Sequence, residues 1–293
     1  MIKIERSNID SIAKDFYTKV AILLKDEHGN SIFDEYYNNL EQYVLCFPMN
    51  FSQKKDDFRE QPGFKEYSVQ MKSLYQKFIS KNGYWLINEL NLKVCPYCNM
   101  QYTFTVNKKK DKNGAIRPQF DHFYPKSQYP QFALSFYNLI PSCPTCNKIK
   151  SIKNIGVNPY LEGFEDNCRF KINNIEKCIL NANNYNAWNL QFEYKEDISK
   201  YKLNVDTFHL EDLYNEMKDY VSEIVFKAQS YNNGYYDNLI KSFENIGLTK
   251  QEMDTIVWGN YLDTAKHQDR PLSKLTSDLL DDLLLWKNDI TNT

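Results

Sequence analysis

The chain lacks the features of a membrane-bound or exported protein. No run approaches the roughly 18 apolar residues of a membrane-spanning helix. The N-terminal stretch MIKIERSNID has no long apolar core of the kind that a signal peptide carries. No internal repeat or long low-complexity tract is present either. We therefore expect a cytoplasmic protein without a membrane partner.

Cysteine and histidine are both scarce, with seven and four residues respectively in a chain of 293. An odd number of cysteines in an intracellular chain argues against a disulfide framework. Four of the seven lie in two matched motifs, CPYCN from Cys95 and CPTCN from Cys143. The other three show no such spacing, and we predict that they are ordinary buried thiols; they are Cys46, Cys168 and Cys178.

The composition is that of a soluble globular protein, and its charge is unevenly distributed. Apolar residues make up 42% and charged residues 25% of the chain. The net charge is −2, but residues 91–160 hold ten Lys or Arg and two Asp or Glu, so the remainder is acidic. A basic island in an acidic chain indicates a local site for a polyanion. A solvated loop is the alternative, since KKKDK at 108–112 supplies part of this charge.

Hydrophobic periodicity divides the chain into three predicted regions. They are a helical region at 1–90, a central region at 91–165 that contains both CxxC pairs, and a mainly helical region at 166–293. The predicted helices include 9–24, 64–79 with its exit at Gly83, a stripe from Leu213 to Ala228, one capped by TKQE at 249–252, and the amphipathic SDLLDDLLLWK. The segments 101–106 and 115–123 predict a β-hairpin around a lysine-asparagine-glycine turn.

The two CxxC pairs predict a four-cysteine metal site. Cys95, Cys98, Cys143 and Cys146 can supply two thiolates from each of two tight turns and so complete a tetrahedron around Zn²⁺. A site closed by four cysteines has no open position, so we expect this zinc to be structural. A redox CxxC is an alternative, but it needs one pair. A rubredoxin-like iron centre is another, because four thiolates also hold iron.

The residues between and around the two pairs resemble the HNH endonucleases of the ββα-metal (His-Me finger) type with a zinc knuckle. The resemblance rests on FDHFYPKS followed by NLIPSCPTCNKIKS, and it covers about a fifth of the chain. It implies an α+β fold, with a small ββα core embedded in a mainly helical protein. The family's functional positions fall here on Asp121, His122, Asn138 and Asn147. Ser151 stands where many relatives have Gly.

The resemblance implies a role for each of these four residues. His122 would be the general base, because imidazole takes up a proton near neutral pH. Asp121 and Asn147 would offer oxygen ligands to a catalytic Mg²⁺ or Mn²⁺. Asn138 would orient the loop that carries the base. Taken one by one, a histidine is usually a core or surface residue, Asn138 could be a turn residue and Asn147 a helix-start residue.

The basic side chains near these positions suggest contacts to a nucleic acid. Lys126, Lys148 and Lys150 are candidate phosphate ligands. The resemblance makes double-stranded DNA the expected substrate. The acidic helical flanks fit a protein partner or self-association better than groove recognition. Together with NPYLEGF and RPLSKLTSDLL, the motifs more loosely resemble bacterial anti-phage HNH nucleases that work with an ATPase, such as the Septu type.

The main alternative is a non-catalytic zinc-knuckle module that binds a nucleic acid or a protein. Such a module would keep the cysteines and the lysines but would not need Asp121, His122 and Asn147 together. Their joint presence favours a metal-dependent endonuclease, and the looser resemblance implies a role in antiviral defence.

Overall fold

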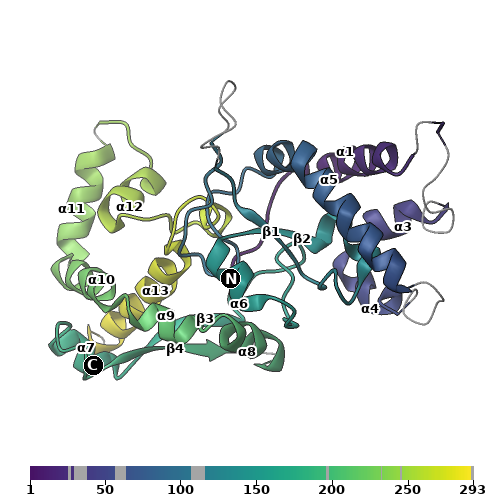
Figure 1. The fold of residues 1–293 in the computed structure, drawn as a ribbon. Helices are drawn as coiled ribbons and strands as arrows, with labels where there is room; N and C mark the ends of the chain where they lie inside the picture. Colours follow the sequence, from purple (N-terminus) through teal and green to yellow (C-terminus); the bar gives the residue numbers. More distant parts are fainter. Residues whose placement is uncertain are drawn as a thin grey trace. The chain divides into compact units, whose positions relative to one another are not determined.

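The structure is a computed structural model, and it combines many helices with two small sheets (Figure 1). It describes residues 1–25, 28–29, 38–56, 64–106, 116–195, 198–231, 233–244 and 246–291. The predicted mixture of helices and small β-elements is thereby confirmed. The lysine-rich turn of the predicted hairpin lies outside the described residues.

Contacts group the chain into two compact units. The N-terminal unit comprises Lys3–Tyr97 and Gln101–Gly163, and the C-terminal unit comprises Met1–Ile2, Cys98–Met100 and Phe164–Thr293. The predicted division into three regions stays a prediction.

The N-terminal unit is built from helices around one two-stranded sheet. Its elements are α1 (Ile9–Leu23), α3 (Leu40–Val44), η1 (Pro48–Asn50), α4 (Phe51–Lys54), α5 (Phe64–Leu90), β1 (Gln119–His122), η2 (Pro130–Phe132), η3 (Phe136–Asn138), β2 (Leu139–Ser142) and α6 (Pro144–Lys150). The apolar stripe of α1 packs on α5, where the rings of Phe16 and Phe78 lie 4.7 Å apart. Phe16 also meets Phe136, which joins the helices to the loop before β2.

The long helix α5 does not end where the sequence suggests. Gly83 was the predicted exit, and this is wrong, because the helix continues to Leu90. Leu86, Ile87 and Leu90 are buried and extend the apolar stripe by two turns, so packing outweighs the low helix propensity of glycine. A Cβ on Gly83 would lie 3.4 Å from the guanidinium carbon of Arg117. The glycine therefore leaves room for that side chain.

β1, β2 and α6 follow one another as a strand–strand–helix unit. The strands are antiparallel, with Gln119 opposite Ser142 and His122 opposite Leu139. This corrects the predicted hairpin, in which 115–123 pairs with 101–106. Among their described residues, those two segments share one antiparallel bridge, between Val106 and Ile116. The reason is that β1 bonds to the strand beside the second CxxC pair instead.

The C-terminal unit contains a second hairpin that the sequence analysis missed. β3 (Cys168–Asn173) and β4 (Asn189–Tyr194) are antiparallel, with Cys168 opposite Tyr194. Their burial alternates, so one face packs inward. The helices of this unit are α7 (Ile175–Leu180), α8 (Ile198–Thr207), α9 (Leu210–Asn215), α10 (Lys218–Ser230), α11 (Asn233–Glu244), α12 (Lys250–Trp258), η4 (Thr264–Lys266) and α13 (Ser273–Thr291).

Two local predictions in this unit are confirmed. Thr249 and Glu252 form the capping box at the start of α12, and each side chain bonds to the backbone of the other residue. The final amphipathic segment forms α13, which packs on β3. The predicted stripe from Leu213 to Ala228 is shared between α9 and α10, because the chain breaks at Glu216 and Met217.

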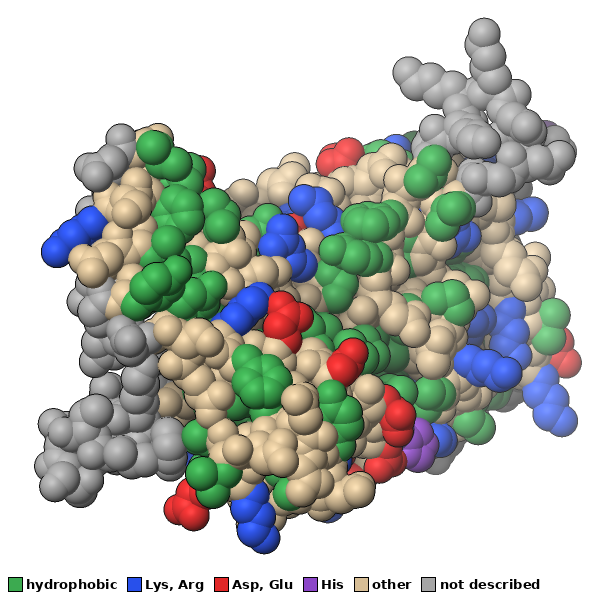
Figure 2. Space-filling model, turned by 90° about the vertical axis from the view of Figure 1, so that its left-hand side faces the viewer, with side chains coloured by type: hydrophobic (Ala, Val, Ile, Leu, Met, Phe, Trp, Pro, Cys, Tyr) green, Lys and Arg blue, Asp and Glu red, His purple; other side chains and the backbone are tan. Residues whose placement is uncertain are grey.

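Two further features are the apolar character of the described helices and the charge on one face of the protein. None of these helices combines the length and apolar character needed to cross a membrane. Figure 2 shows a face on which acidic and basic side chains are interspersed rather than gathered into a field of one sign. This face therefore offers no broad basic surface of the kind that a nucleic acid would require.

Candidate nuclease site beside a four-cysteine cluster

The two CxxC pairs come together in the structure. The sulfur atoms of Cys95, Cys98, Cys143 and Cys146 all lie within 4.8 Å of one another, and all four residues are buried. The first pair sits in a turn that is closed by the bond from the Cys95 amide to the Gln101 carbonyl, 2.9 Å. In the second pair, the Cys143 sulfur caps α6 and accepts a bond from the Cys146 amide at 3.4 Å.

This donor set fits a metal ion such as zinc. Tetrahedral zinc with Zn–S bonds of about 2.3 Å holds its sulfurs roughly 3.8 Å apart, which is compatible with the observed cluster. All four cysteines are free thiols rather than disulfides. The predicted metal site is therefore present as a cluster of four ligands, and zinc as its occupant belongs to the proposal below.

His122 lies at the end of β1 and is almost enclosed, with 4% of its surface exposed. Its Nε2 donates a hydrogen bond to the Ala133 carbonyl at 3.1 Å. Because a carbonyl can only accept, this bond places the proton of the neutral ring on Nε2 and the lone pair on Nδ1. The ring of Tyr75 packs edge-on against the imidazole at 4.5 Å.

The free nitrogen of His122 is suited to accept a proton. Among the described residues Nδ1 has no hydrogen-bond partner. Burial lowers the pKa of His122 well below its usual value near 6.5. The charges of Lys126 and Lys150 lower it further, while the bond to Ala133 acts in the opposite direction. The ring is therefore neutral at pH 7 and carries an available lone pair.

Asn138 holds the loop between β1 and β2. Its side-chain nitrogen donates to the carbonyls of Phe132 at 2.9 Å and Tyr124 at 3.1 Å, and its side-chain oxygen accepts from the Tyr124 amide at 2.7 Å. Its own carbonyl accepts from the Phe123 amide. These bonds span the segment that follows His122, which is the placement that a loop-orienting asparagine requires.

Asp121 is engaged differently from the prediction. It is buried, and Tyr97 donates a hydrogen bond of 2.7 Å to Oδ2, while the Lys150 ammonium lies 3.2 Å from the same oxygen and 3.5 Å from Oδ1. Burial raises the pKa of Asp121, and Lys150 and Tyr97 oppose this rise. Both carboxylate oxygens therefore already face donors, where the prediction assigns a metal ion.

Lys150 also departs from its predicted role as a phosphate ligand. It has no exposed surface, and its ammonium donates a bond of 2.6 Å to the His122 carbonyl in addition to its pairing with Asp121. These contacts tie α6 to the end of β1. Lys150 thus positions the strand that carries His122, since a buried ammonium cannot reach a phosphate at the surface.

The remaining predicted residues lie nearer the surface. Asn147 is half-buried, and its side-chain nitrogen donates to Gln119 Oε1 at 2.6 Å. Lys126 is half-buried and lies over the Tyr75 ring at 4.9 Å, while Lys148 is exposed on α6. Within the described ranges, the cysteine cluster is the one group of at least three His, Cys, Asp or Glu ligands able to share an ion. As arranged, Asp121 and Asn147 do not fit the predicted Mg²⁺ or Mn²⁺ site.

The other cysteines are buried, as predicted, and stand apart from the cluster. Burial raises the pKa of Cys168 to about 12 and that of Cys178 to about 12. Neither residue therefore provides a thiolate near neutral pH. Cys46 donates a weak bond to the Phe47 carbonyl.

Several residues at the site escaped the sequence analysis. Tyr97 stands inside the first CxxC pair and hydrogen-bonds Asp121, and Ala133 contributes a carbonyl that no side-chain pattern can reveal. Arg117 lies just before β1 and lines a cavity with Lys126 and Asn147. Its place in the basic segment was the one signal that could have drawn attention to it.

Comparison with known proteins adds no relative. No family model, no curated protein and no solved structure matches the chain. Any function assigned to it therefore rests on the geometry of its own residues.

Proposed function

We propose that the chain is an endonuclease that hydrolyses phosphodiester bonds of DNA, with His122 as the general base. The observation that carries this proposal is the state of the imidazole, whose Nε2 is held by the Ala133 carbonyl while no hydrogen bond engages Nδ1 among the described residues. A neutral ring fixed in one tautomer beside a basic cavity is what proton abstraction from water requires.

The reaction would use the residues in the following way. Nδ1 of His122 takes a proton from a water molecule as its oxygen attacks the phosphorus atom. The bond between phosphorus and the departing oxygen breaks, and that oxygen acquires a proton from solvent. Lys126, whose charge already acts on His122, would contribute positive potential to the site from the adjacent cavity.

The proposal gives a structural role to zinc and assigns no reaction step to a catalytic divalent ion. Zinc held by Cys95, Cys98, Cys143 and Cys146 would clamp the β1–β2–α6 unit, which is too small to fold around a core of its own. A catalytic Mg²⁺ or Mn²⁺ would polarise the phosphate and stabilise the departing oxygen when bound. Because Asp121 is paired with Lys150, we assign no step of the reaction to that ion.

Plasmid cleavage by the purified full chain tests the proposal. We expect nicking or linearisation by the wild type, and a loss of about 100-fold or more in His122→Ala and in the better space-filling His122→Gln. His209→Ala is the matched control, because His209 is an exposed histidine. Parallel reactions with EDTA, Mg²⁺ or Mn²⁺ decide whether a divalent ion is needed. Full activity in both folded His122 variants would overturn the assignment.

The pH dependence gives a second readout. Since the pKa of His122 lies well below 6.5, the base stays unprotonated as the pH falls through 6.5. Cleavage should therefore persist at mildly acidic pH. A rate that falls in proportion to the protonation of an ordinary histidine near pH 6.5 would contradict the assigned environment.

A binding module is the second candidate, and the pairing of Asp121 with Lys150 favours it. That buried pair has a structural explanation without any reaction. DNA binding with no cleavage under any metal condition would support this alternative. The predicted ATPase partner and the role in antiviral defence belong to the nuclease proposal, and cleavage by the chain alone would show that no partner is needed for activity.

A further inference from the structure

A surface cavity of about 400 Å³ opens in the N-terminal unit between α5 and β1. Its nine lining residues include Tyr75 from α5, Gln119 from β1 and Asn147 from α6, with Arg117 and Lys126 from the flanking segments. Two of the nine are cations and none is acidic. A cavity lined in this way attracts an anion.

Arg117 is held in the cavity by rings rather than by carboxylates. Its guanidinium lies 5.7 Å from the Tyr84 ring centre and 5.8 Å from that of Phe120. One of its terminal nitrogens donates to the Pro118 carbonyl at 3.0 Å. In the described part of the chain no acidic side chain pairs with it, so its other N–H groups stay available. The guanidinium packs against the backbone at Gly83, where a Cβ would lie 3.4 Å from it.

Lys126 is the second cation, and it too has no acidic side chain within ion-pair distance among the described residues. It lies over the Tyr75 ring. Burial lowers the pKa of Lys126. The charges of Lys72 and Lys150 lower it further, and the charge of Asp121 raises it. An anion in the cavity would therefore stabilise the charged form of this lysine.

The neutral groups of the cavity add further donors. Asn147 donates its side-chain N–H to Gln119 Oε1 at 2.6 Å, which occupies the acceptor of Gln119 and leaves the amide nitrogen of that residue to donate. A guanidinium, an ammonium and an amide nitrogen together form a set of donors. Such a set matches the oxygens of a phosphate group.

We propose that this cavity binds a phosphate group of the DNA strand next to the one that is cleaved. The inference rests on the proposed nuclease function and adds Arg117 as a substrate-binding residue. Tyr75 lines the cavity, and its ring packs against the His122 imidazole at 4.5 Å, so the cavity adjoins the proposed base. The phosphate in the cavity is therefore a neighbour of the attacked phosphate, and it would set the register of the strand at His122.

The test measures binding of a labelled DNA duplex to the full chain in EDTA, by fluorescence anisotropy over a range of salt concentrations. Arg117→Gln and Lys126→Gln should each weaken binding and reduce the slope of log K against log salt by about 0.9, and the double variant by about 1.8. Arg117→Lys should keep most of the slope, because the charge remains.

Two matched controls separate phosphate binding from lost ring contacts. Arg270 stacks on Tyr261 at 4.6 Å and donates to the Gly259 carbonyl at 3.1 Å, which reproduces the contacts of Arg117 outside the cavity. Lys200 lies 5.3 Å over the ring of Tyr201. Arg270→Gln and Lys200→Gln should leave the slope unchanged. Thermal unfolding of every variant shows that each one is folded.

The outcomes distinguish this site from the nuclease itself. If the wild type cleaves plasmid but the Arg117 and Lys126 variants keep its salt slope, the proposal that the cavity binds phosphate is wrong. The nuclease proposal is then unaffected. A slope that depends on these residues, without cleavage under any metal condition, would support the cavity and contradict the nuclease. A wild type that does not bind DNA would overturn the cavity.

Discussion

Each unit of the protein contains one buried lysine–aspartate pair, and the two pairs are built alike. Lys150 and Asp121 approach to 3.2 Å in the N-terminal unit, and Lys274 and Asp278 approach to 2.9 Å in the C-terminal unit. In both, the lysine also donates to a backbone carbonyl, and the aspartate accepts a second bond from a group outside the pair.

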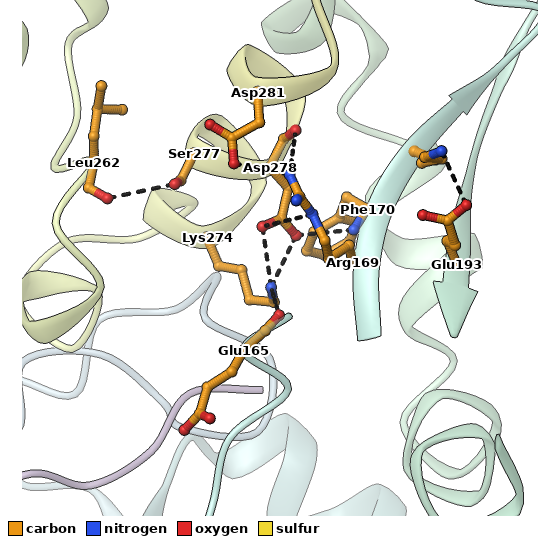
Figure 3. A network of polar contacts seen from close by, with 10 residues as sticks. Glu165, Arg169, Phe170, Glu193, Leu262, Lys274, Ser277, Asp278 and Asp281 are labelled. Carbon is orange, nitrogen blue, oxygen red and sulfur yellow. Dashed lines mark hydrogen bonds and ion pairs between the residues drawn. The ribbon is translucent and has the colours of Figure 1, made fainter. Parts of the chain in front are cut away.

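In the C-terminal unit, the charged groups around the pair are themselves paired. Lys274 and Asp278 are one turn apart on α13, and Asp278 accepts a bond from the Phe170 amide of β3 at 2.9 Å (Figure 3). Arg169 reaches the Asp278 carbonyl at 3.3 Å and pairs with Asp281 at 2.9 Å. Burial raises the pKa of Asp278, and Lys274 opposes the rise. These contacts fasten α13 to β3.

The pair in the N-terminal unit lies instead beside the proposed base, His122, and an excess of positive charge. Lys150 binds the carbonyl of His122, whose Nδ1 is free, and the nearby Lys126 has no acidic partner among the described residues. The comparison teaches that a buried ion pair alone is not a mark of function. The distinguishing features are an adjacent base and cations whose charge is not neutralised.

Loss of the four-cysteine cluster should give the largest difference in stability between the two units. Cys143→Ala removes a ligand of the expected zinc, whose binding supplies on the order of 10 kcal/mol in small metal-dependent folds. We expect hydrogen exchange of β1, β2 and α6 to lose protection while β3 and β4 keep theirs. Cys178→Ala is the control and should cost about 1–2 kcal/mol. Unchanged protection of β1 in Cys143→Ala would show that no metal clamps this unit.

Breaking each ion pair should destabilise the two units to different extents. This difference should be smaller than the one caused by loss of the cysteine cluster. Lys150→Met leaves Asp121 buried without a cation, with the Tyr97 hydroxyl and the His122 backbone amide as its donors, and we expect a loss of about 3–5 kcal/mol in the free energy of unfolding. Lys274→Met should cost less, about 2 kcal/mol, because Asp278 keeps Arg169 and the Phe170 amide. Urea unfolding measures both. A larger loss in Lys274→Met would reverse the ranking and refute the comparison of surroundings.

The buried histidines should give the smallest difference in stability, and this difference depends on pH. His267 in the C-terminal unit has an enclosed Nε2 without a partner, and burial lowers its pKa to about 4. Its unfolded value is near 6.5, so its contribution to stability is complete above that pH and is lost as the pH falls towards 4. The loss amounts to at most about 3 kcal/mol.

His267→Gln tests this dependence by unfolding at neutral pH and near pH 4. The variant should lose less stability on acidification than the wild type, although His122 still contributes in the same direction. Equal losses in variant and wild type would show that His267 is not buried in the neutral form.

Elements with strong local signals were predictable from sequence. The helix predicted at 9–24 appears as Ile9–Leu23, and the capping box at Thr249 is formed. β3 and β4 were missed, because each six-residue strand gains its stability from the other and from α13. Gly83 misled the prediction for the same kind of reason, since the burial of Leu86, Ile87 and Leu90 in the tertiary structure continues the helix.

The candidate site divides in the same way. The spacing within CPYCN and CPTCN is a local property, so the sequence by itself determined that four thiols would be offered from two tight turns. The sequence also placed Asp121, His122 and Asn138 at the two ends of one loop. Tertiary structure alone decided that Lys150 meets Asp121, that Ala133 selects the tautomer of His122, and that Arg117 lines a cavity with Lys126. These contacts join residues that are far apart in the chain or depend on a backbone carbonyl, so no local sequence pattern encodes them.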